Sequence, residues 1–266
     1  MQILIYVGTA PSRELVLQMS QPLAQRTASA VTLVACGHDR VALLDDALRR
    51  LALPSSVAVA LRPLDGTAQG AILEAAGEQT YDLVVFGRLQ QPSGRLLPGT
   101  HSKAIAQRLE PSVLRVHGSA RPLKRILVAS GGDHHTFADT AMAEKLATPF
   151  GASVTLLHVI SQQSLLFEGF SQRQTTADTL LAVDSREART IRAAAAQLTA
   201  QGVQTQIKGR VGLVLDEIMA ELRIGGYDLL VIGAHRVASA LDRILLEDIT
   251  GDLLDVSPLP VLVVKR

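Results

Sequence analysis

Short runs of β-branched and aliphatic residues alternate along the chain with longer segments in which apolar residues recur every three or four positions. The second half shows this most clearly, with strands expected at about 125–130, 153–159, 203–208, 228–232 and 261–264. The short runs are typical of strands buried on both faces, and the longer segments are typical of helices. The alternation predicts βα units and a parallel sheet.

The strand-like runs occur twice, in the same order. Tyr81–Gly87 (YDLVVFG) returns as Tyr227–Gly233 (YDLLVIG), and three shorter runs repeat in the same way: Ile3–Ile5 as Ile126–Val128, Val31–Val34 as Val154–Leu157, and Val113–Val116 as Val261–Val264. Four ordered matches indicate a duplication. We therefore predict one doubly wound α/β domain in each half, residues 1–118 and 123–266, with a linker at Gly118–Pro122.

The second half carries an insertion between its second and fourth strands. The polar run 161–181, rich in Ser, Gln and Thr, is the candidate segment, and we expect a surface loop there rather than a specific lid. After it, Asp184 begins a sequence typical of a helix start, in which its side chain would accept a hydrogen bond from the amide near Glu187. Gly202 stands where a left-handed helix end is expected.

Glycine-rich segments follow the first and fourth strands of each half. In an open parallel sheet, ligands bind outside the carboxyl ends of the strands, so these segments mark the expected sites. They are Gly8–Ala10 and Gly131–His135 after the first strands, Gly87-Arg88 and Gly233–Arg236 after the fourth, and the helix starts near Gly99-Thr100 and Glu247-Asp248.

The strand order, the apolar runs that end at Gly87 and Gly233, and the closing segment Pro260–Val264 (PVLVV) resemble the universal stress protein family over almost the whole chain, twice. The resemblance implies two tandem five-stranded parallel-sheet domains of the Rossmann-like, adenine nucleotide alpha hydrolase type. Family members often dimerise through their last strands. Many bind ATP through a Gly-x2-Gly-x9-Gly-Ser/Thr pattern and an Asp after the first strand.

The first half keeps part of that ATP pattern. A glycine lets backbone approach a phosphate, and free amides at a helix start favour an anion. An equally open interpretation is that the closing Gly-Thr pair only caps a helix. The candidate cofactor-binding residues here are Gly8, Gly87, Arg88, Gly99 and Thr100, with Arg95 and Lys103 as further positive charges, while Gln90 replaces the second glycine of the pattern.

The second half departs further from the pattern. Its candidates are Gly131 and Gly233, but Glu247 and Asp248 replace the closing Gly-Ser/Thr pair. Carboxylates at a helix start occupy the amides that a phosphate needs and repel its charge. We therefore expect the second half not to bind a triphosphate. The Asp after the first strand is absent from both halves, so ATP or another adenine nucleotide in the first half stays an open question.

Composition and net charge limit the partners and the cellular location that we expect for this protein. The formal net charge of +1 gives no field that would attract nucleic acid, and no apolar stretch has the length of a membrane helix. The single cysteine, Cys36, is consistent with a reducing compartment, and the N-terminal segment does not resemble a signal peptide, so we expect a cytoplasmic protein.

The sequence gives only weak indications of a metal site or of a catalytic site. Asp133, His134, His135 and His235 fall on segments expected to converge, but adjacent histidines commonly point apart, so no metal site is predicted. The acids Asp45-Asp46 stand beside Arg49-Arg50, which favours surface ion pairs. No nucleophile elbow, Walker loop or Gly-x-Gly-x-x-Gly motif occurs, and we expect no catalysis.

The sequence is compatible with three functions. The leading one is a non-catalytic stress-response or signalling module of the universal stress type, with degenerate nucleotide motifs and an unidentified protein partner. The alternatives are an adenine nucleotide sensor that binds through the first half, and a nucleotide-dependent hydrolase or transferase. The apolar last strands of the two halves are expected to pair, which gives an intramolecular pseudo-dimer, and a homodimer stays open.

Overall fold

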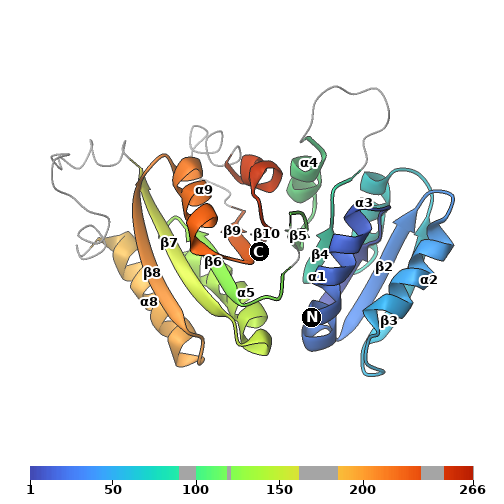
Figure 1. Cartoon of the computed structure of the whole chain (residues 1–266), viewed down its shortest axis with the longest axis horizontal. Coiled ribbons are helices and arrows are strands. Elements are labelled where there is room, and N and C mark those ends of the chain that lie inside the picture. The colour runs from blue at the N-terminus through green and yellow to red at the C-terminus, as the bar shows by residue number, and fades with distance from the viewer. Residues whose placement is uncertain (90–99, 119–120, 162–184, 235–248, 266) are drawn as a thin grey trace. The chain divides into compact units, whose positions relative to one another are not determined.

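The computed structural model describes residues 1–89, 100–118, 121–161, 185–234 and 249–265. The chain divides into two compact units, Met1–Pro122 with Leu254–Arg266, and Leu123–Leu253. Both units contain a parallel sheet with helices packed on it, as Figure 1 shows. The predicted α/β fold with repeated βα units is thereby confirmed.

The first unit has five parallel strands in the order β3-β2-β1-β4-β5. Consecutive residues of the central strand, Ile3, Leu4 and Ile5, are all fully buried, because both faces of the sheet are covered by helices. The strands are β1 (Gln2–Tyr6), β2 (Ala30–Cys36), β3 (Ala58–Leu64), β4 (Leu83–Phe86) and β5 (Ser112–Arg115).

The helices of the first unit lie in two layers. α1 (Ser12–Thr27) packs against α2 (Arg40–Leu51), and α3 (Ala68–Glu78) packs against α4 (Thr100–Arg108). This division follows from right-handed crossovers, because the chain moves outward from β1 to β3 and then returns across the sheet to β4.

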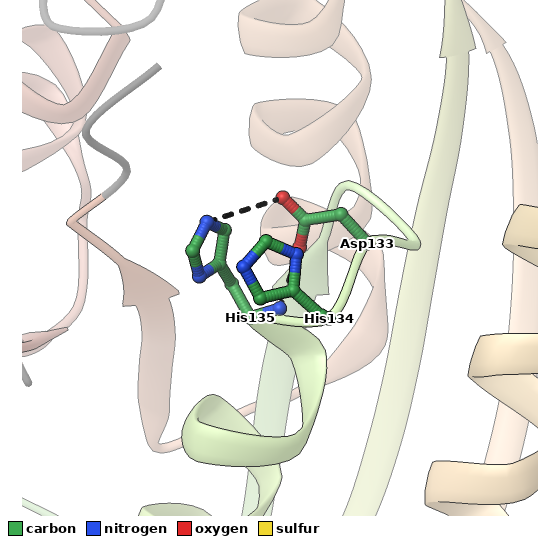
Figure 2. Close-up of side chains that lie close together, drawn as sticks. All are labelled: Asp133, His134 and His135. Carbon is green, nitrogen blue, oxygen red and sulfur yellow. Dashed lines mark hydrogen bonds and ion pairs between the residues drawn. The ribbon is translucent and has the colours of Figure 1, made fainter. Parts of the chain in front are cut away.

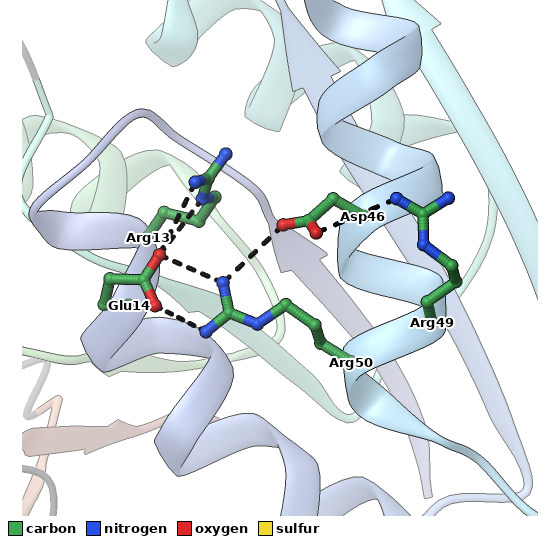
Figure 3. Close-up of polar contacts among 5 residues, drawn as sticks. All are labelled: Arg13, Glu14, Asp46, Arg49 and Arg50. Carbon is green, nitrogen blue, oxygen red and sulfur yellow. Dashed lines mark hydrogen bonds and ion pairs between the residues drawn. The ribbon is translucent and has the colours of Figure 1, made fainter.

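Ion pairs join α1 to α2 on the surface (Figure 3). Arg50 Nη1 of α2 donates to Glu14 Oε1 of α1 at 3.0 Å, and the Arg50 guanidinium also lies 3.6 Å from Asp46 Oδ2. Arg49 contacts the same carboxylate at 3.8 Å. The expected surface ion pairing of this acidic segment is confirmed for Asp46. Hydrogen bonds from Arg50 lower the pKa of the Glu14 carboxyl, whereas such exposed pairs add little to stability.

The second unit repeats the element order of the first. Its four parallel strands run in the order β9-β6-β7-β8. The elements are β6 (Arg125–Ser130), α5 (Thr136–Ala147), the 3-10 turn η1 (Thr148–Phe150), β7 (Ser153–Ser161), α8 (Arg186–Ala200), β8 (Thr205–Gly212), α9 (Val214–Gly225) and β9 (Leu229–Gly233). α5 packs beside α8, while α9 packs on β7 and β8.

The last strand, β10 (Val261–Val264), joins the first unit. It pairs antiparallel with β5, with Val261 opposite Arg115 and Val263 opposite Val113. The expected pairing of the two last strands is therefore present. It covers the apolar edge of β5, which explains why Leu254–Arg266 groups with the first unit although the sequence analysis assigned it to a domain 123–266.

Two helix ends allow a comparison with the sequence analysis. The N-cap of α8 is Ser185, whose hydroxyl accepts from the Ala188 amide at 3.0 Å, and not the predicted Asp184, which lies outside the described residues. Gly202 has the left-handed φ of 79° that was predicted for it, and its amide donates to Thr199 O.

The predicted loop 161–181 lies outside the described residues, apart from Ser161 at the end of β7. In the portion of the chain that the structure describes, no helix has both the length and the apolar character needed to cross a membrane.

Candidate functional site

The second unit contains a cavity at the carboxyl ends of its strands. β6 has β7 on one side and β9 on the other, and the chain reaches these two neighbours through separate connections. This reversal of strand order is where open α/β sheets form their binding crevice. A cavity of about 550 Å³ occupies this place, bordered by the ends of β6, β7 and β9 and by the start of α8.

The cavity has apolar walls and a polar rim. Leu157 of β7, Ile218 of α9 and Ile232 of β9 are among the apolar side chains that line it. Backbone of the segment after β6 borders it at Gly131 and Gly132. The charged groups on the lining are Asp133, Arg186 and Glu187, and the other polar side chains are Ser130, His134, His135 and Thr250.

Hydrogen bonds hold the segment between β6 and α5 in place. The Ser130 hydroxyl accepts from the Gly132 amide at 3.1 Å and lies 2.5 Å from the Thr136 hydroxyl. His158 Nδ1 is 3.0 Å from Ser130 O, which joins the end of β7 to the end of β6. These bonds tie the segment to both β7 and α5, so its backbone presents a fixed rim to the cavity.

Gly132 is required by a close approach of α8. Its φ is +80°, and a Cβ atom at this position would stand 2.7 Å from Glu187 Cβ. The absence of a side chain thus lets the start of α8 pack against the end of β6. As a result, Arg186 and Glu187 are brought to the cavity from a distant part of the sequence.

A buried acid lies in α5, one turn after this segment. Asp139 is 2% exposed, and its Oδ2 has no hydrogen-bond partner within the described part of the chain. Burial, and secondly the charge of Asp133, raises its pKa from 3.8 to about 7. Asp139 was not predicted from the sequence. Its helical spacing could have revealed it. Asp139 stands three positions after Thr136 and four before Ala143, so this charged residue falls on the buried face of the helix.

In the first unit, the corresponding glycines have different surroundings. Gly8 is half-buried after β1. At Gly87, a Cβ atom would stand 2.1 Å from Ser12 Oγ and 2.9 Å from Val16 Cγ2, so α1 itself approaches the end of β4. The packing of α1 therefore accounts for Gly87 without a ligand.

The other residues predicted for the first unit are only partly described. Arg88 is exposed after β4, and Thr100 is the first residue of α4, as expected for a residue at a helix start. Gly99 lies outside the described residues, as do Glu247 and Asp248 of the second half, so the predicted obstruction of phosphate there stays a prediction.

Positive charge accumulates where β4 and β5 end. Arg115 of β5 is 8% exposed, and in the chain as described neither its Nε nor its Nη1 has a hydrogen-bond partner. Asp255 Oδ1 lies 3.8 Å from Nη1. The pKa of Arg115 lies below its ordinary value. Burial is the main cause and the charge of Arg88 adds to it, whereas the charge of Asp255 acts in the opposite direction. Burial together with Arg115 lowers the pKa of His117 to about 4, so this imidazole is neutral at pH 7.

We expect Arg115→Met to stabilise the protein by about 1–3 kcal/mol, because a buried charge with incomplete pairing is replaced by an apolar side chain of similar length. Urea denaturation at neutral pH measures the change. Arg62→Met, at a more exposed arginine on β3, is the matched control and should change stability much less. A loss of stability in Arg115→Met would show that the guanidinium is well compensated in the native state.

The structure places two of the predicted candidates in one cavity. Gly131 and Gly233 both border it, at the ends of neighbouring strands. Sequence reasoning did not anticipate Arg186 and Glu187, because α8 begins after the long insertion and no motif connects it with β6. It also did not anticipate that the rings of His134 and His135 lie together, with centroids 3.8 Å apart.

Comparison with known proteins agrees with this architecture. None of the curated proteins matches the chain. A universal stress protein from Archaeoglobus fulgidus has a TM-score of 0.64 and 17% identity over 99% of this chain and 96% of its own. A functionally unknown protein from Pseudomonas aeruginosa PAO1 has a TM-score of 0.69 and 21% identity over 100% of this chain and 92% of its own. At these identities the likeness concerns the fold.

The family itself is established from the sequence. The model of the universal stress protein family matches residues 122–265, which is more than half of the 266 residues. The matched segment includes β6, the cavity and the closing strand β10. This chain belongs to the universal stress protein family.

Proposed function

We propose that this chain is a non-catalytic stress-response module whose second unit binds a small ligand with a flat aromatic ring, of the class of an adenine nucleoside or a nucleotide with few phosphates. The cavity at the ends of β6 and β9 is the observation that carries the proposal. Its volume of about 550 Å³ falls within the range of small-molecule sites. Its apolar walls suit a ring, and its rim offers polar groups to a sugar.

The charges on the rim favour a ligand with few phosphates. Asp133 and Glu187 bring two carboxylates, whereas Arg186 brings one guanidinium. Asp133 Oδ1 also accepts from the His135 amide at 2.9 Å, so an acid already occupies a donor at the start of α5. A triphosphate would meet net repulsion here, in line with the sequence-based expectation that the second half does not bind one.

The polar groups beside the cavity favour binding over catalysis. The Ser130 hydroxyl is engaged by Thr136 and Gly132. An activated nucleophile needs a free hydroxyl next to a general base, and His158 instead directs Nδ1 to the backbone oxygen of Ser130. These groups thus build the segment after β6, and their arrangement supports a binding role for the cavity.

A pair of equivalent substitutions tests the proposal. Gly131 borders the cavity, has open space around the position of a Cβ atom and does not have a left-handed φ, so Gly131→Leu fills the cavity mouth without strain. Adenosine and AMP should stabilise the wild-type chain, by about 2.7 kcal/mol at a hundred times Kd, and Gly131→Leu should weaken their binding at least about tenfold. Thermal denaturation and calorimetric titration measure both effects.

Gly8→Leu is the matched control, since Gly8 follows β1 as Gly131 follows β6. It should leave binding unchanged. With a metal chelator present, ATP should bind more weakly than AMP. If Gly8→Leu abolishes binding while Gly131→Leu does not, or if ATP binds more tightly than AMP, the site in the second unit is refuted. Turnover of ATP by the wild-type chain would refute the non-catalytic role.

A second candidate function concerns an anion site in the first unit, the alternative in which a nucleotide binds through the first half. The buried, incompletely paired guanidinium of Arg115 favours it, because an anion would pair with this charge and with Arg88. Inorganic phosphate and AMP should then raise the melting temperature of the wild-type chain but not that of Arg115→Met. Equal effects on both proteins would exclude the anion site.

The remaining expectations from the sequence stay predictions. They are a cytoplasmic location, an unidentified protein partner and a homodimer.

A further inference from the structure

Three potential metal ligands gather where the chain passes from β6 into α5. Asp133, His134 and His135 each place one ligand atom so that all of these atoms lie within 4.8 Å of one another. Figure 2 shows the two imidazoles side by side, with the Asp133 carboxylate directed at His135. Asp133 Oδ2 is 3.7 Å from His135 Nε2, and the ring centroids of the histidines are 3.8 Å apart with a tilt of 40°.

Local hydrogen bonds explain why adjacent histidines do not point apart here. Asp133 Oδ1 accepts from the His135 amide, which folds the segment into a tight turn, and Thr136 N donates to Asp133 O. His135 O accepts from the amides of Ala138 and Asp139, which starts α5. One carboxylate oxygen thus stabilises the turn, and the other stays beside the imidazole. The turn therefore keeps the three residues next to one another, and their ligand atoms meet beside it.

We propose that Asp133, His134 and His135 bind a divalent transition-metal ion of the zinc class. Bonds of about 2.0–2.1 Å to nitrogen and oxygen put tetrahedral donor atoms about 3.3 Å apart. The Asp133–His135 pair is already within a few tenths of an ångström of that separation. His134 is exposed, so rotation of its side chain closes the remaining distance.

The donor set defines the class of metal. Two imidazoles and one carboxylate suit zinc, nickel, cobalt and copper, whereas magnesium and calcium prefer oxygen ligands alone. Three protein ligands leave at least one coordination position open. Because all three residues line the cavity, water or a donor atom of a ligand bound there could complete the shell.

The charges around the cluster are compatible with a cation. Glu187 lines the same cavity and lies close to Gly132, while Arg186 opposes a cation from the exposed start of α8. With neutral imidazoles, Asp133 and Glu187 together outweigh Arg186. The proposal does not depend on a ligand in the cavity, since the three residues are arranged by the turn alone.

Metal titration of the tag-free full-length chain, after treatment with chelator and dialysis, tests the site. Calorimetry with Zn²⁺ should show one site, and Co²⁺ should give the visible absorption of a four- or five-coordinate ion. Mg²⁺ should show no binding. Asp133→Asn, His134→Gln and His135→Gln should each lower the affinity at least about tenfold.

The choice of variants separates the loss of a metal ligand from other effects of a substitution. Asn at position 133 retains an oxygen that accepts from the His135 amide, so Asp133→Asn removes the charged ligand and preserves the turn. His38→Gln, at an exposed histidine of the first unit, is the control and should bind Zn²⁺ as the wild-type chain does. The proposal is overturned if no Zn²⁺ binds, if His38→Gln weakens binding as much as the three variants, or if the variants keep the wild-type affinity and fold.

Discussion

Asp139→Ala is expected to stabilise the protein at about pH 8 by on the order of 2–4 kcal/mol and to remove a large part of its pH dependence between about pH 4 and pH 7. Asp139 lies in α5 with 2% exposure, and its Oδ2 lacks a hydrogen-bond partner in the described chain. Raising a carboxyl pKa from 3.8 to about 7 corresponds to on the order of 4 kcal/mol against the ionised form. Urea denaturation across this pH range, with a metal chelator present, measures the effect.

The direction of the pH effect follows from proton binding. Below about pH 4, Asp139 is protonated in both states and adds no penalty. As the pH rises towards 7, the unfolded chain loses this proton while the folded chain keeps it, so the folded state becomes relatively less stable. Above about pH 7 the full penalty is present. The alanine variant lacks this titration, and the difference between the two proteins therefore grows from pH 4 to pH 8.

Two further variants separate charge from polarity. Asp139→Asn removes the charge but keeps a buried polar group, so it should recover only part of the gain. Asp252→Ala removes an exposed carboxyl from the same unit and should give a small change. If Asp139→Ala destabilises the protein at pH 8 as much as at pH 4, an interaction of the carboxylate outweighs its burial, and this account of the residue is wrong.

The strands were predicted well from sequence because their signal is local. Val154–Leu157, for example, is a run of β-branched and aliphatic residues in which every side chain is buried, as expected when both faces of the sheet are covered. The repeat of this run from the first half then fixed its place in the element order. By contrast, β8 extends to Gly212, beyond the predicted end near 208, because it pairs with β7 as far as Ser161. Strand length depends on the partner, which the local pattern does not contain.

The candidate site was predicted only in part, and the reason is again the range of the interactions. Gly131 and Gly233 were found because the end of a strand can be located in sequence and parallel strands end at one edge. Arg186 and Glu187 were missed because Gly132 lets α8 approach from a distant segment. His134 and His135 were expected to diverge, whereas their rings lie together on a turn that is closed by the hydrogen bond from the His135 amide to Asp133.

An ionic cluster around the buried Glu221 of the second unit carries the other large expected effect. Lys208 and Arg210 of β8 are two residues apart and so share one face of the strand, and both reach Glu221 of α9. Lys208 Nζ is 2.7 Å from Glu221 Oε1, Arg210 Nε is 3.0 Å from Oε2, and the Tyr227 hydroxyl donates to Oε1 at 2.8 Å. Glu221 is only 2% exposed.

Glu221 needs its ion pairs to stay charged inside the protein, whereas Lys208 and Arg210 can stay charged without Glu221. Burial alone would raise the pKa of Glu221, but hydrogen bonds from Lys208, Tyr227 and Arg210 outweigh burial and hold the pKa below its ordinary value of 4.5. The side chains of Lys208 and Arg210 keep 32% and 24% of their exposure, so they can turn to water when the acid is absent. Glu221 has no such route.

We therefore expect the double variant Lys208→Met/Arg210→Met to destabilise the protein by about 3–5 kcal/mol at pH 8, because it leaves a buried carboxylate without a cation. Glu221→Met should cost only about 1–2 kcal/mol, chiefly through the hydroxyl of Tyr227, which loses its acceptor. Urea denaturation of the three proteins gives the comparison. If Glu221→Met is less stable than Lys208→Met/Arg210→Met, an unpaired buried carboxylate is not the main cost, and this explanation is wrong.

The pH dependence gives this cluster an independent signature. In the wild-type chain, the stability that ionised Glu221 contributes is present above about pH 4.5 and is lost as the pH falls below that value, because the folded-state pKa is the lower one. Without Lys208 and Arg210, burial dominates and raises the pKa of Glu221, so the double variant loses stability as the pH rises. The gap between the two proteins should accordingly widen from pH 4 to pH 8, whereas the gap between the wild-type chain and a protein that has only lost packing would stay nearly constant.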